Sequence, residues 1–230
     1  MPSSWWPAFE REVLRINRRY NLEIIEALGV CPYARGARGS GASTVLVLPV
    51  EEASVEALLA VVEALEPQGE IEVAQVVMPL AVGAPAAFSE VAARFGEANA
   101  KRHGGKRPVF VHAAFHPQLT YYTDTPARLV PFFRRSPDPM VQLVRLSVLD
   151  SIHANRPRGT QFFDGDPSEF LRLLRARPES ITDRITRENH ERALAGELAQ
   201  IEGLMAEIHA DRAASYHPFL DSAARREVAG

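Results

Sequence analysis

The chain has 230 residues, 46% of them hydrophobic and 24% charged, with a formal net charge of −3. This composition is typical of a globular protein with one domain, or one domain and an extension, and excludes disordered, collagen-like and disulfide-scaffold chains. The charge balance gives no basic face for nucleic acid. One cysteine, a charged N-terminus and the lack of a long apolar stretch predict a soluble, cytoplasmic protein that binds neither nucleic acid nor membrane.

Helical and strand patterns alternate in the first half of the chain. Apolar spacing predicts helices over 8–28 (ended by Gly29), 51–66 and 85–103, and strands over 43–50, 70–79 and 108–115, with a glycine-rich loop after the first helix. Such alternation predicts an α/β fold, in which a small sheet of three or more strands is covered by helices.

The second half begins with a proline-rich, irregular stretch over 118–139. Helices are predicted over 140–154, 167–176 and 180–212, the first with Met140 and Leu143 on its apolar side. The pattern divides the chain into an α/β domain (1–165) that carries the site and a helical C-terminal extension (166–230). We expect the extension to pack on the domain or on a second copy of the chain, which would then be a homodimer.

Cys31 is the first residue that could carry chemistry. It follows a helix and precedes a loop with Arg35 and Arg38, and positive charge favours the thiolate that nucleophilic and metal-ligating cysteines require. A Cys-Pro pair is also found at thiolate ligands of haem iron. The alternative is a buried structural cysteine, since cysteine is among the most frequently buried residues.

His112 and His116 share one face of the predicted third strand. At about 3.3 Å per residue they lie about 13 Å apart, too far to hold one metal ion together. His116 follows the strand, where ligands usually bind in α/β folds, so it is the better candidate to meet Cys31. The alternative for either histidine is a hydrogen-bonded packing residue.

Arg134, Arg135 and Ser136 precede the helix predicted over 140–154, which Ser136 or Asp138 would cap. Two guanidinium groups beside a helix N-terminus favour an anion such as a carboxylate or a haem propionate. The alternative is a solvated basic turn.

Three segments in this order, GVCPYAR, AAFHP and RRSPDPMVQLVRLSV, resemble the bacterial domain of unknown function 1415 over about residues 25–152. The resemblance implies that Cys31, His116, Arg135, Ser136 and Pro137 belong to one site, and it supplies no activity. A weaker similarity connects the same arrangement to haem-dependent N-hydroxylases that act on arginine-like substrates.

The chain departs from the family pattern at two positions. The pattern often has Asn before Arg-Ser-Pro and His two residues after the Met, where this chain has Arg134 and Gln142. If the missing histidine were a ligand, the chemistry of this chain would differ from that of the family.

Three hypotheses follow: two describe an enzyme that modifies a small molecule, and the third describes a non-catalytic protein. The leading one is a haem-dependent oxidoreductase that oxidises an amine or amino acid, with His116 or Cys31 on the iron and with Arg134, Arg135 and Ser136 around the cofactor. The second is a cofactor-free thiol enzyme in which Cys31 attacks and His116 acts as base. The third is a non-catalytic scaffold that associates through its C-terminal helix.

Overall fold

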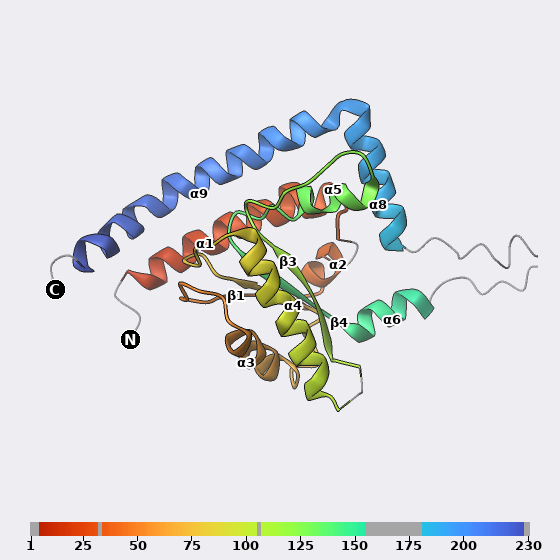
Figure 1. Ribbon diagram of the computed structural model, residues 1–230, viewed down its shortest axis with the longest axis horizontal. Helices are drawn as coiled ribbons and strands as arrows, with labels where there is room; N and C mark the ends of the chain where they lie inside the picture. The colour runs from red at the N-terminus through yellow and green to blue at the C-terminus, as the bar shows by residue number, and fades with distance from the viewer. Residues whose placement is uncertain (1–4, 32–33, 105–106, 155–180, 228–230) are drawn as a thin grey trace, which may run out of the picture.

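The computed structural model describes residues 5–31, 34–104, 107–154 and 181–227 (Figure 1). Its elements are α1 (Trp6–Tyr20), the π-helical turn η1 (Asn21–Glu26), α2 (Ala34–Gly39), β1 (Ser43–Val47), α3 (Val55–Leu65), β2 (Val73–Val77), α4 (Pro85–Arg102), β3 (Phe110–Phe115), α5 (Pro126–Phe133), β4 (Met140–Arg145), α6 (Leu146–Ala154), α8 (Ile181–Arg192), the π-helical turn η2 (Ala193–Glu197) and α9 (Leu198–Glu227). The helix predicted over 167–176 lies outside the described residues.

The described strands form one mixed sheet in the order β1-β2-β4-β3. β1 and β2 are parallel and are connected through α3, whereas β4 runs antiparallel to both β2 and β3. This arrangement confirms the α/β fold class. The three strands predicted from the first half of the chain are present, each within a few residues of its expected range.

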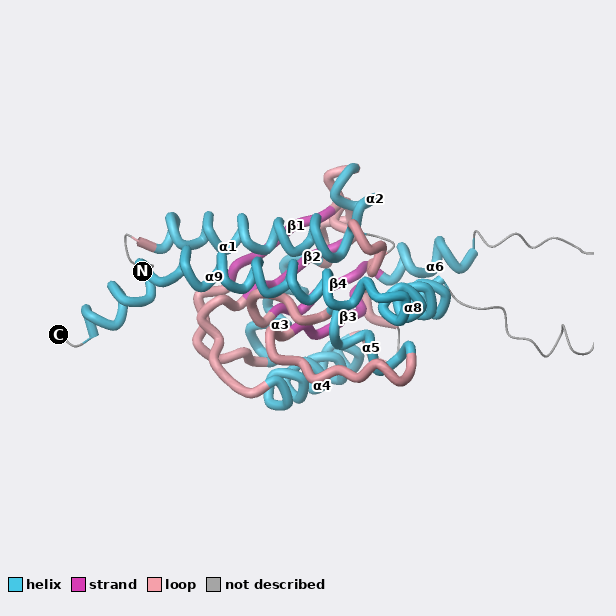
Figure 2. The backbone as a smooth tube through the Cα atoms, turned by 90° about the horizontal axis from the view of Figure 1, so that it is seen from above, coloured by secondary structure: helices cyan, strands magenta, loops and turns pink. Residues whose placement is uncertain are grey.

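Each face of the sheet has its own hydrophobic cluster. α3 and α4 cover one face, where residues such as Leu58 and Phe95 pack on Val76 and Val141. α1, η1 and α9 cover the other face (Figure 2). Alternate residues of a strand point to opposite faces, so the parity of each strand residue decides which cluster it joins.

The prediction of one helix over 140–154 is wrong, because Met140–Arg145 is the central strand β4 and only Leu146–Ala154 is helical. β4 is covered on both faces, so its apolar residues run almost without interruption instead of alternating. A run of this kind also fits helical spacing, and periodicity alone does not separate the two. The cap assigned to Ser136 or Asp138 is wrong for the same reason: a strand follows them.

Two further segments differ from the sequence prediction. The glycine-rich stretch after Cys31 contains the short helix α2 where a loop was expected. The C-terminal helix is not continuous from residue 180, since η2 separates α8 from α9 at Gly196, whose φ of 104° is unfavourable for residues with a side chain. The end of the first helical segment at Gly29 is confirmed by its left-handed φ of 63°.

α9 packs along α1 and belongs to the same hydrophobic cluster (Figures 1 and 2). Asp211 of α9 accepts hydrogen bonds from Arg15 and Arg19 of α1. Asp138, which is 2% exposed, binds Arg212 Nε and the Tyr216 hydroxyl, both at 2.7 Å. The extension is thus fixed to the sheet by buried polar contacts as well as by apolar packing. None of the described helices is long and apolar enough to cross a membrane.

Candidate functional site

Four amides meet between the helical segment α1–η1 and the sheet, and we call Asn17, Asn21, Gln75 and Gln142 the amide cluster. Asn21 is half-buried and the other three are buried. Gln75 and Gln142 are paired residues of β2 and β4. Gln75 Oε1 accepts from Asn17 and Asn21 at 2.8 Å, and Gln75 Nε2 donates to Gln142 Oε1 at 3.5 Å. Buried amides are costly unless they are hydrogen-bonded, so this network fixes the orientation of Gln142.

Cys31 lies at the end of this network. It follows the helical segment that ends at Gly29, and it is half-buried. Gln142 Nε2 donates to Cys31 Sγ across 3.7 Å. Since an N–H group pointed at sulfur favours the negatively charged thiolate over the thiol, the central strand of the sheet supplies one stabilising group.

Cys31 lines a cavity of about 260 Å³ on the α1 side of the sheet, which we call the Cys31 cavity. The polar groups on its wall come from Cys31, Arg134, Gln142, Thr186 and Asn189. Apolar side chains from several elements complete the wall, among them Val30, Phe115, Phe133 and Ile185. The cavity therefore combines one sulfur atom and a few polar groups with an apolar interior, which is typical of small-molecule sites.

Arg134 is the only charged residue among the described residues that line this cavity. Burial lowers the pKa of its guanidinium, and Tyr20 and Cys31 oppose that shift. The guanidinium lies 5.8 Å from the centre of the Phe115 ring, and no described residue forms an ion pair or a side-chain hydrogen bond with it. A half-buried cation without a carboxylate partner among the described residues is suited to bind an anion from solution.

α8 contributes the outer wall through Ile185, Thr186 and Asn189. Asn189 is 6% exposed, no side-chain hydrogen bond joins it to another described residue, and its amide is not among the buried atoms that lack any partner. α8 packs on α5, and His190 Nε2 lies 2.8 Å from the carbonyl oxygen of Thr123. The sequence analysis assigned no chemistry to this helix, and its polar sequence carries no signal that would have singled out Asn189.

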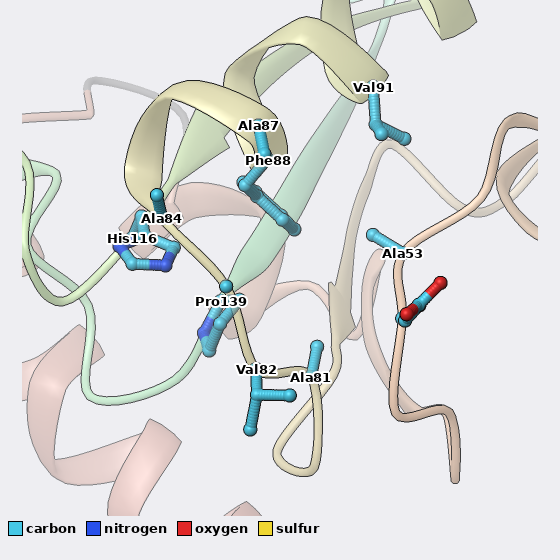
Figure 3. Close-up of a pocket in the computed structure, with 11 residues that line it drawn as sticks. Ala53, Ala81, Val82, Ala84, Ala87, Phe88, Val91, His116 and Pro139 are labelled. Carbon is cyan, nitrogen blue, oxygen red and sulfur yellow. The ribbon is translucent and has the colours of Figure 1, made fainter.

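The structure does not bring His116 into the Cys31 cavity. His116 lines a different cavity of about 290 Å³ with Phe88 and Pro139 (Figure 3). The reason is strand parity: Ala113 and Phe115 of β3 face the Cys31 cavity, so the side chains at even positions point to the opposite face. His112, which packs against Phe95 of α4 with ring centres 5.2 Å apart, follows the same rule.

His116 is held by the backbone around it. Nδ1 accepts from the backbone N–H of Gln118 at 3.2 Å, and the backbone of Gly83 lies beside the ring. Burial lowers the pKa of this histidine, and the Gly83 contact only partly opposes that shift. Here His116 connects the end of β3 to the loop before α4, as the packing alternative predicted.

Arg135 and Ser136 face away from the Cys31 cavity. Arg135 Nε donates to the carbonyl oxygen of Pro117 at 3.2 Å, and Ser136 is buried with its hydroxyl donating to the carbonyl oxygen of Asp138. Of the residues that the haem hypothesis placed around one cofactor, only Cys31 and Arg134 line a common cavity; His116, Arg135, Ser136 and the Pro137 of the family resemblance do not line it. In the described part of the chain, no three His, Cys, Asp or Glu residues gather as a metal site would require.

The contact between Gln142 and Cys31 was not predicted from the sequence. Gln142 was identified there only as a departure from the family pattern. Gln75 and Gln142 each stand in the middle of an apolar run, VAQVV and MVQLV. An amide that interrupts a buried strand is a usable signal, because it needs a partner inside the protein. Both departures noted above, Arg134 and Gln142, line the Cys31 cavity.

Comparison with known proteins gives one family. The family model described as "Protein of unknown function (DUF1415)" matches residues 13–165, which include β1 to β4 and the Cys31 segment but not α8 or α9. No curated protein and no solved structure matches the chain. Since the match covers well over half of its length, the chain belongs to the DUF1415 family.

Proposed function

We propose that this protein is a thiol enzyme whose substrate is a small molecule with a carboxylate held by Arg134. The Cys31 thiolate forms a bond to an electrophilic carbon of that molecule, and the leaving group on the same carbon departs with the electron pair of the broken bond. The observation that carries the proposal is that the guanidinium of Arg134, half-buried and without an ion-pair partner among the described residues, lines the same cavity as the single cysteine of the chain. The carboxylate would restore the missing partner, and the substrate carbon beside it would lie near the sulfur.

Two groups support a reactive thiolate. The charge of Arg134 attracts a thiolate at Cys31, and Gln142 donates an N–H to the sulfur. Charge attraction is stronger in an apolar cavity than in water, since water screens it less there. A thiolate stabilised in this way attacks without an adjacent base, so the mechanism does not need the imidazole of His116.

This proposal keeps the thiol hypothesis of the sequence analysis and changes its second residue. Arg134 and Gln142 replace His116 as the groups that prepare the sulfur. The haem hypothesis, with His116 or Cys31 on the iron, has less support, because neither candidate ligand shares a cavity with Arg135 or Ser136. His116 also lines a cavity that Arg134 does not line.

A pair of alkylating reagents tests the proposal. Iodoacetate carries a carboxylate and iodoacetamide a neutral amide of the same size; with each, sulfur forms a bond to carbon and iodide leaves. We expect Cys31 to prefer iodoacetate about tenfold more than a free model thiol does, the factor that about 1.4 kcal/mol of charged hydrogen bonding gives. The chain has one cysteine, so mass spectrometry reports this site alone.

Arg134→Met should remove the preference, because it keeps most of the side-chain volume and loses the charge. Arg135→Met is the matched control. It removes the same charge from the next residue in the chain, whose side chain does not line the cavity. Equal preference in the wild type and the free thiol, or an unchanged preference in Arg134→Met, would overturn the proposal.

A further inference from the structure

α8 lies beyond the family match, yet it forms one wall of the Cys31 cavity. Three of its residues line the cavity. Ile185 and Thr186 are adjacent in sequence, and Asn189 follows about one helical turn later. The site of this chain is therefore completed by a segment that the family model does not include. A side chain on this segment is in a position to select the substrate.

Asn189 is the residue of α8 best placed to bind a charged substrate. The residue is 6% exposed, no hydrogen bond joins its side chain to another described residue, and it shares the cavity with Arg134. Its amide is not among the buried atoms cut off from any partner, so it is open to a ligand in the cavity. An amide N–H and a guanidinium that face one cavity are together suited to the two oxygens of a carboxylate.

The rest of the cavity limits the charge and the size of the ligand. Arg134 is the only cationic side chain on the described wall, so a dianion such as phosphate would keep one charge unpaired in an apolar space, at high cost. Nine of the fourteen lining residues are apolar. At about 30 Å³ for an atom the size of a water molecule, 260 Å³ holds about nine non-hydrogen atoms.

We infer that the Cys31 cavity selects short-chain monocarboxylic acids, with the carboxylate on Arg134 and Asn189 and the hydrocarbon chain against the apolar wall. This inference rests on the proposed function and adds its substrate class and a specificity-determining residue, Asn189. The side chain at position 189 must be neutral, since an anion there would pair with Arg134 and repel the substrate.

The test measures how added anions slow the alkylation of Cys31 in the full-length protein by neutral iodoacetamide. Butyrate should protect better than acetate by about fifteenfold, since each buried methylene tightens binding about fourfold. Phosphate and succinate should give no protection at concentrations where butyrate is saturating. Protection by phosphate equal to that by butyrate would overturn the inference.

Two variants examine Asn189. Asn189→Asp should abolish protection by butyrate, and Asn189→Leu, which keeps the volume without the amide, should weaken it about threefold to tenfold, the loss of one hydrogen bond. Arg184→Gln is the control: it makes the same change in net charge on α8, at an exposed position outside the cavity. Circular dichroism of each variant verifies folding.

The outcomes separate the inference from the function on which it rests. If the wild type prefers iodoacetate through Arg134 but Asn189→Asp still binds butyrate as the wild type does, the thiol enzyme stands and the role of Asn189 is wrong. If Cys31 shows no preference for iodoacetate at all, the proposed function fails first.

Discussion

Gly96→Ala should destabilise the protein, although the same change in a helix interior normally stabilises it. Gly96 lies in α4, where it faces β3, and a Cβ atom at this position would lie 2.3 Å from Cε1 of His112. The imidazole has little room to move, because it packs edge-on against Phe95 and lies beside the backbone of Ala92. Overpacking of this kind costs about 1–3 kcal/mol, which exceeds the gain of about 1 kcal/mol in helix propensity.

Gly203→Ala provides the matched comparison. Gly203 is an exposed position of α9, and nothing lies within 4 Å of its added Cβ, so we expect a gain of up to about 1 kcal/mol. Urea unfolding followed by circular dichroism gives the free energy of unfolding of each variant. Equal stabilisation by the two substitutions would refute the packing of α4 against β3 described above.

The remaining predictions concern buried polar groups. Tyr216→Phe leaves the buried carboxylate of Asp138 without one hydrogen bond, so the free energy of unfolding should fall by about 2 kcal/mol in urea titrations, and no change would contradict the contact. Burial lowers the pKa of His112, His116 and His209 below 6.5, so the unfolded chain binds more protons than the folded one at acidic pH. Stability should therefore decrease as the pH falls from 7.5 to about 5.5, and a rise in the melting temperature over that interval would contradict the burial of these rings.

The sequence predicted the α/β class because strands 43–50, 70–79 and 108–115 are separated by segments with clear helical spacing. It failed at Met140–Arg145, where an apolar strand buried on both faces has the same pattern as a buried helix. The strand order β1-β2-β4-β3 could not be predicted from the sequence either, since it depends on which strand edges meet in space.

The candidate site was predictable in part. Cys31 and Arg134 were identified from thiol chemistry and from the basic turn, and they do line one cavity. His116 was expected beside them because it ends a strand, but the parity of β3 sends its side chain to the other face. Asn189 enters the site through the packing of α8, which no local pattern encodes.

The dependence of the Cys31 alkylation rate on pH tests the central claim most directly, because this rate follows the thiolate fraction. The account predicts that Arg134→Met moves the midpoint of the iodoacetamide profile upward by about one pH unit or more, since loss of a cation that shares an apolar cavity with the sulfur disfavours the thiolate by about that amount. Arg135→Met should leave the midpoint where it is in the wild type. If Arg134→Met and the wild type have the same midpoint, the guanidinium does not act on the sulfur and the account is wrong.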